Sequence, residues 1–188
     1  MSKVAVVYFT NTDVTGQLAK ACISAAEQAG VKTCIHRILG EEIIEGRFKN
    51  ADLFDRLADC DAIVFASPTY MGGPAAQFKA FADASSEYWS EQLWAGKVAA
   101  GITSGAAPNG DQTATLQYFS TLASQHGMFW VGLNVFHGYK EQALNRLGSQ
   151  MGVVAESADG FVNSSDLETA AYLGRRVANI TKQLKIKL

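Results

Sequence analysis

The chain has 188 residues, of which 18% are charged and 48% are hydrophobic, and this balance excludes a disordered chain. We expect residues 1–188 to form one domain with a sizeable core. The 16 basic and 18 acidic residues give a formal charge of −2. Because no basic excess is available to neutralise phosphates, the composition argues against nucleic-acid binding.

The sequence also argues against a membrane span. No apolar run approaches the roughly 20 residues that a span needs, and the N-terminal residues lack a signal-peptide pattern, so we expect a cytoplasmic protein. Cys22, Cys34 and Cys60 are widely spaced without a C-x-x-C pair, which predicts core cysteines rather than disulfides. No histidine or carboxylate cluster has metal-ligand spacing, so we expect no metal site.

The apolar pattern predicts five strands in chain order. Residues 4–9 are continuously apolar and β-branched or aromatic, as is typical of a strand buried on both faces of a parallel sheet. Similar runs predict the other four strands at residues 32–38, 62–66, 98–102 and 128–135.

Helical spacing of apolar residues separates most of these strands. It predicts helices over residues 15–30, around Phe78 and Phe81, around Leu116 and Phe119, and from Leu167 to the C-terminal end. Ser164 or Ser165 is a candidate cap for the last helix, because Asp166 and Glu168 then fall in its first turn. For residues 40–49 we expect a loop with a helical turn or two.

The alternation of strands and helices predicts an α/β protein, a three-layer α/β/α sandwich with a five-stranded parallel sheet. Open parallel sheets bind ligands beyond the carboxyl ends of their strands, where the strand order reverses. The loops that follow the first, third and fourth strands are therefore the candidate binding loops, at residues 10–17, 67–74 and 103–112.

The first loop joins a strand directly to a helix and is rich in hydroxyl and amide side chains. Hydroxyl donors around a helix N-terminus can bind a phosphate without lysine or arginine. The alternative is that Thr12, Asp13 or Thr15 only caps the helix. Neither G-x-x-x-x-G-K-[ST] nor G-x-G-x-x-G is present, so the sequence supports neither a P-loop NTPase nor a Rossmann dehydrogenase.

The two later loops hold all three prolines of the chain, Pro68, Pro74 and Pro108. In the second loop Tyr70 and Met71 offer a ring and a thioether suited to the face of a flat aromatic ligand, although a rigid turn with an incidental tyrosine is the alternative. In the third loop small residues leave backbone groups free to meet the edge of a ring.

Together these loops resemble the flavodoxin-like superfamily, and the closest likeness is to the WrbA-type NAD(P)H:quinone oxidoreductases and related flavin reductases. The resemblance extends over the whole chain and rests on five segments in order. They are Tyr8-Phe9-Thr10, Ser67-Pro68-Thr69-Tyr70-x-Gly72 with the following Gln77, Phe78, Lys79, Phe81 and Asp83, then Gly96-Lys97, Thr103-Ser104-Gly105 and His126-Gly127-Met128.

The resemblance implies a bound FMN and an assignment of residues to its parts. The phosphate is expected at Thr10, Asn11, Thr12, Asp13, Val14 and Thr15. The ring and ribityl chain are expected against Pro68, Thr69, Tyr70, Met71, Gly72 and Gly73, and the pyrimidine side along Thr103, Ser104, Gly105, Ala106, Ala107 and Gly110. His126 matches a histidine near the flavin and is the candidate catalytic residue, and Trp89 matches an aromatic residue on the substrate side.

Two residues depart from the family pattern. Asp13 stands where flavodoxins usually have glycine, and it adds a negative charge beside the expected phosphate. Tyr70 stands where WrbA-like proteins often carry arginine. Of the other histidines, we interpret His36 as structural and His137 as a loop residue.

The resemblance implies an enzyme that passes two electrons from NAD(P)H through FMN to a quinone or similar small acceptor, with Tyr70, Met71 and Trp89 stacking on the flat reactants. A flavodoxin-type electron carrier is the alternative, but such carriers use a strongly acidic face and this chain carries only −2. A cofactor-free interaction module on the same fold is a third possibility. By resemblance to WrbA-like enzymes we expect a homodimer or homotetramer.

Overall fold

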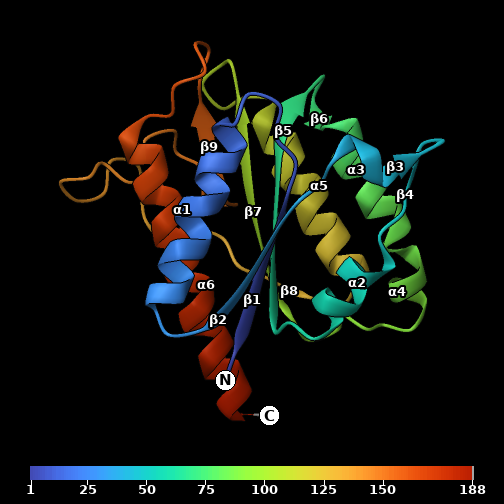
Figure 1. Ribbon diagram of the computed structural model, residues 1–188. Helices are drawn as coiled ribbons and strands as arrows, with labels where there is room; N and C mark the ends of the chain where they lie inside the picture. The colour runs from blue at the N-terminus through green and yellow to red at the C-terminus, as the bar shows by residue number, and fades with distance from the viewer. Residues whose placement is uncertain (188) are drawn as a thin grey trace.

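The structure, a computed structural model, describes residues 1–187 and arranges them as a sheet between two layers of helices (Figure 1). The strands are β1 (Lys3–Tyr8), β2 (Lys32–Arg37), β3 (Ile43–Ile44), β4 (Arg47–Phe48), β5 (Ala62–Tyr70), β6 (Gly73–Pro74), β7 (Val98–Gly105), β8 (Phe129–Trp130) and β9 (Val153–Glu156). The helices are α1 (Val14–Gln28), the 3-10 turn η1 (Gly40–Glu42), α2 (Ala51–Ala58), α3 (Ala76–Ala84), α4 (Ser86–Ser90), α5 (Gln112–Gln125) and α6 (Ser164–Lys187).

The central sheet has the order β2-β1-β5-β7-β8, and these strands are all parallel. The continuous apolar run of the first strand is buried on both faces, as the sequence predicts. From β1 the chain moves outward in one direction to β2 and in the other to β5, so the strand order reverses between β1 and β5. The candidate loops at the carboxyl ends of β1, β5 and β7 are consequently neighbours at one edge of the sheet.

The prediction of one continuous fifth strand over residues 128–135 is wrong beyond Trp130. The fifth position is shared, because β8 pairs with Val98 and Ala99 of β7, whereas β9 pairs with the later part of the same strand. Between them the chain leaves the sheet and returns as a loop whose Gly152 packs on β7. A Cβ at Gly152 would lie 2.5 Å from the Gly101 carbonyl oxygen. This returning backbone occupies the edge of β7 that a longer strand would need.

The core is divided by the sheet into two layers. Helices α1 and α6 lie side by side over one face, and α2, α3 and α5 cover the other (Figure 1). All three cysteines are free, and Cys22 and Cys60 are buried as predicted, whereas Cys34 is only partly buried. Burial raises the pKa of the Cys22 thiol to about 12 and that of Cys60 to about 11, so both thiols are unreactive at neutral pH.

The start of α6 corrects a second prediction. Neither Ser164 nor Ser165 is the cap, because the helix begins at Ser164 and the Asn163 side-chain oxygen accepts the Ser165 N–H at 2.9 Å. Asp166 does lie in the first turn, as predicted, and Arg146 donates to both of its carboxylate oxygens at 2.9 and 2.8 Å. This partly buried pair fixes the loop that precedes β9 against the last helix.

Residues 40–49 form one 3-10 turn and the two-residue hairpin of β3 and β4, so the expected loop with a helical turn also contains a small strand pair. The Glu42 carboxylate joins this segment to the sheet, because it lies 3.0 Å from His36 Nε2. His36 therefore has the structural role that we predicted for it.

Candidate functional site

The candidate site lies at the carboxyl edge of the sheet, where the loops after β1, β5 and β7 meet at the top of the molecule (Figure 1). Three hydroxyl contacts tie these loops together. Thr15 Oγ1 lies 2.8 Å from Ser104 Oγ, which connects α1 to the end of β7. Thr69 Oγ1 lies 2.8 Å from both Thr103 Oγ1 and Thr115 Oγ1, which connects the second loop to β7 and α5.

The first loop presents the N-terminus of α1 to the edge of the sheet. Asp13 is the N-cap residue, but its side chain accepts no capping hydrogen bond from the helix. The simple capping alternative therefore does not hold for Asp13, and the first backbone N–H groups of α1 are left for another acceptor. Thr10 and Thr15 are buried, whereas Asn11 and Thr12 are exposed at the tip of the loop.

The second loop is a tight hairpin that the sequence did not predict. Thr69 pairs with Pro74 and Tyr70 with Gly73 in an antiparallel ladder between β5 and β6. Met71 and Gly72 form the turn with φ values of 49° and 77°, the pattern of a two-residue type I′ turn. The hairpin holds Met71 fully exposed and Tyr70 half-exposed, so the expected ring and thioether surface faces solvent.

The third loop is held from beneath by Gln112, the last residue of the predicted loop range, to which the sequence assigned no role. Its Nε2 donates to the Ala107 carbonyl at 2.6 Å, and its side chain packs against Gly105. Its Oε1 is buried and has no hydrogen-bond partner among the described residues. The available signal was its position as the first residue of α5, directly after the loop.

A hollow of about 550 Å³ separates the first and second loops. Its lining combines aromatic, amide and cationic side chains: Phe9, Asn11, Tyr70, Pro74, Ala76, Gln77 and Lys79. The Lys79 ammonium is paired with Asp83 one helical turn further along α3. The hollow therefore offers a mixed apolar and polar surface next to Tyr70.

Two predicted site residues do not join this group. His126 follows α5 and precedes β8, which pairs with the first residues of β7, so it lies at the amino edge of the sheet. Trp89 of α4 lies there too, and the two residues line one hollow of about 190 Å³ with Ser85 and Asp83. Within one chain the sheet therefore separates Trp89 and His126 from the three binding loops, and their expected place near the flavin stays a prediction.

The surroundings of His126 keep it uncharged. It is 1% exposed and its ring lies 4.2 Å from that of Trp94. Ser85 Oγ donates to the Ala82 carbonyl at 2.7 Å, so it must accept its 2.9 Å bond from His126 Nε2. Nδ1 is then the unprotonated nitrogen, and it has no partner among the described residues. Burial lowers the pKa of His126 to about 4.

We predict that acidification destabilises the fold through His126. In the unfolded chain its pKa is about 6.5, so between pH 6.5 and pH 4 the unfolded state binds the proton first and the folded state loses stability. The expected loss at pH 5 is about 2 kcal/mol. Urea unfolding near pH 7.5 and pH 5 measures it, with the exposed His137→Gln variant as control. A His126→Gln variant as pH-sensitive as the parent would contradict the assignment.

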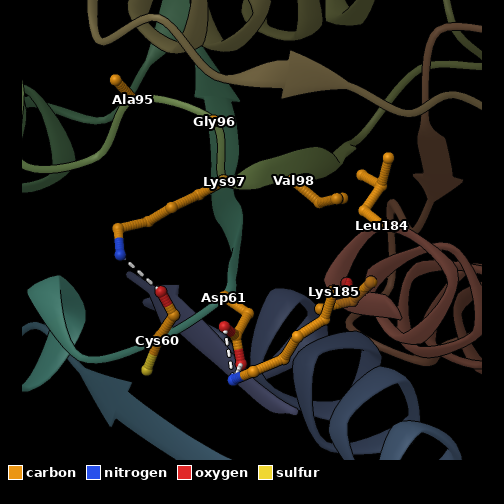
Figure 2. A pocket seen from close by; sticks show the side chains of 9 residues that line it. Cys60, Asp61, Ala95, Gly96, Lys97, Val98, Leu184 and Lys185 are labelled. Atoms are coloured by element: carbon orange, nitrogen blue, oxygen red, sulfur yellow. Dashed lines mark hydrogen bonds and ion pairs between the residues drawn. The ribbon is translucent and has the colours of Figure 1, made fainter. Parts of the chain in front are cut away.

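A second hollow at the amino edge, of about 240 Å³, contains two lysines but no free cation (Figure 2). The Lys97 ammonium donates to the carbonyl oxygens of Ala58 and Cys60 at the end of α2. Lys185 is paired with the Asp61 carboxylate at 2.9 Å. Because both ammonium groups have partners within the chain, the lysines stabilise the packing of α2 and α6.

Within residues 1–187, no three His, Cys, Asp or Glu side chains are grouped as a metal site. No helix in this part of the chain is long and apolar enough to cross a membrane.

Comparison with known proteins identifies the family. A family model described as NADPH-dependent FMN reductase matches residues 3–142. Flavodoxin FldP of Pseudomonas aeruginosa (strain UCBPP-PA14) is 38% identical over 192 residues, covering 98% of this chain and 99% of that protein. An NAD(P)H dehydrogenase (quinone) of Archaeoglobus fulgidus is 32% identical over 198 residues, covering 98% and 100%.

The crystal structure of a flavodoxin, WrbA-like protein from Agrobacterium tumefaciens is 39% identical. It covers 97% of this chain and 99% of its own, with a TM-score of 0.76. The fold is thus flavodoxin-like, as the sequence predicts. The chain belongs to the NADPH-dependent FMN reductase family, and its resemblance to the WrbA-type proteins is confirmed.

Proposed function

We propose that the chain is an FMN-dependent oxidoreductase that transfers two electrons from NAD(P)H to a quinone or a similar small acceptor. One observation carries the proposal. The N-terminus of α1, which lacks a side-chain cap, and the hairpin that exposes Tyr70 and Met71 lie at the same edge of the sheet. Family membership and the quinone-reducing relative support it. Because its cysteines are free thiols, we also assign the protein to the reducing cytoplasm.

The residues present fit FMN. The N-terminal N–H groups of α1 and the hydroxyls around them would hold the phosphate without a cation. The residues of this part are Thr10, Asn11, Thr12, Asp13, Val14 and Thr15, of which Asp13 adds a negative charge beside the phosphate. The second loop, Pro68 to Gly73, would hold the ring and ribityl chain. The third loop, with Thr103, Ser104, Gly105, Ala106, Ala107 and Gly110, would hold the pyrimidine edge.

When bound, FMN supplies the site where a hydride is accepted and then delivered. The protein contributes positions and surfaces. Tyr70 and Met71 offer a flat contact for the nicotinamide and then for the quinone, so the two reactants use one place in turn and compete for it. The polar hydroxyl network below them keeps the three loops in one arrangement for both reactants.

The placement of the exposed Trp89 supports a homodimer or homotetramer. Trp89 can approach binding loops only if the hollow at the amino edge of one copy faces the carboxyl edge of another. Trp89 and Phe129 are both exposed at this end of the molecule, which is typical of an interface. A monomeric mass at micromolar concentration in solution would exclude this arrangement.

In such an oligomer we predict that Trp89→Ala raises the KM for the quinone by about three- to tenfold, because one aromatic stacking contact is lost. The FMN content should change less than this KM, since Trp89 is expected on the substrate side of the flavin. Trp89→Phe retains a ring and serves as the control. Steady-state rates at varied quinone concentration measure the effect, and an unaltered KM in the alanine variant would exclude the role.

The similarity to a protein named flavodoxin keeps electron transfer between proteins as the second candidate. Purified protein is loaded with FMN, desalted and assayed for oxidation of NADH and NADPH with benzoquinone. Turnover with a nucleotide supports the enzyme. Retained flavin without turnover favours the carrier, and loss of the flavin on desalting contradicts both functions.

A further inference from the structure

The carboxylate of Asp13 is placed at the first turn of α1 without a hydrogen-bond partner on the helix. The residue has φ 64° and ψ 1°, a left-handed conformation that glycine adopts freely and that aspartate and asparagine tolerate better than most residues. Its Oδ1 is in contact with Gly16, where a Cβ would overlap it. The negative charge is therefore held beside the helix N-terminus.

Little in the chain neutralises this charge. Among the described residues its ion-pair partner is Lys20, whose Nζ lies 3.7 Å from Asp13 Oδ2, and both side chains are at least half exposed. Such a pair is weak and is screened by salt. Arg37 approaches the same loop, but it donates to the Thr10 carbonyl at 3.3 Å.

We infer that Asp13 is a specificity residue that lowers the preference of the flavin site for phosphorylated over unphosphorylated flavin. This inference rests on the proposed function, because it concerns the phosphate end of the same site. A phosphate at the α1 N-terminus carries close to two negative charges, and the Asp13 carboxylate repels it. Riboflavin has no phosphate, so the same carboxylate leaves its binding unchanged.

Asp13→Asn separates charge from backbone strain, because asparagine also tolerates the left-handed conformation. We expect this variant to bind FMN about tenfold more tightly, with riboflavin affinity changed less than about twofold. Asp13→Gly should raise the ratio of FMN affinity to riboflavin affinity by the same factor. Asp52→Asn is the matched control, since Asp52 is an exposed acid in the first turn of α2.

The measurement is the quenching of flavin fluorescence during titration of FMN and of riboflavin, at low and at high salt. A gain in affinity confined to FMN, and reduced by salt, cannot come from a damaged fold and supports the inference. Equal FMN affinities in the parent and Asp13→Asn overturn it while leaving the proposed function intact. If neither flavin binds to either protein, the proposed function fails and the inference fails with it.

Discussion

Thr12→Glu lowers the affinity for FMN by about 30-fold or more. Thr12 is exposed at the tip of the first loop, next to the N-terminus of α1. A carboxylate there meets a phosphate with close to two negative charges, and each pair of unit charges at about 4 Å costs roughly 1 kcal/mol in water and more near a protein surface. Two such pairs correspond to about 2 kcal/mol, which is about 30-fold.

The control is Thr121→Glu, the same substitution at an exposed position of α5 near the amino edge of the sheet. It should leave FMN affinity and thermal stability unaltered. Fluorescence titration measures the affinity, and a melting curve without flavin shows that both variants fold. Equal FMN affinity in Thr12→Glu and the parent would mean that the phosphate does not bind at this loop.

Gly174→Ala lowers the free energy of unfolding by about 3 kcal/mol. Helices α1 and α6 lie side by side (Figure 1). At Gly174 of α6 a Cβ would overlap the Cys22 carbonyl oxygen and lie 2.8 Å from its carbonyl carbon. Both atoms belong to the backbone, so the helices themselves must separate. In a helix, alanine is otherwise more favourable than glycine by about 1 kcal/mol. A loss of stability in the variant therefore reports the close contact between α1 and α6.

Gly40→Ala is the control, since a Cβ at Gly40 meets no atom within 4 Å. Its free energy of unfolding should stay within about 0.5 kcal/mol of the parent value. Urea unfolding followed by circular dichroism measures both variants. Parental stability in Gly174→Ala would show that α1 and α6 are not packed as closely as described.

The sequence is a good guide wherever burial on both faces leaves an uninterrupted apolar run, as in β1 and β5. It fails where a strand is completed by a distant segment, because nothing in residues 128–135 signals that Gly152 will return beside β7. It also missed α2. That helix has only eight residues, and its start depends on Asn50, whose side-chain oxygen accepts the Leu53 N–H at 3.0 Å.

The three candidate loops were predictable because strand order alone places them together, and the hydroxyl contacts between them follow from that placement. The role of Gln112 was missed, since its bond to the Ala107 carbonyl, five residues earlier, depends on the conformation of the loop, which spacing does not reveal. The motifs around Trp89 and His126 indicate the protein family, but they do not say at which edge of the sheet the two residues lie. A linear motif does not say whether a residue serves its own chain or a second copy.

The most direct test follows the flavin spectrum of the FMN-loaded, desalted protein without oxygen, first on addition of NADH or NADPH and then of benzoquinone. We predict that one nucleotide bleaches the flavin band and that the quinone restores it, each in one stoichiometric step. A retained flavin that neither nucleotide bleaches would contradict the proposal that this chain transfers electrons from NAD(P)H to a quinone.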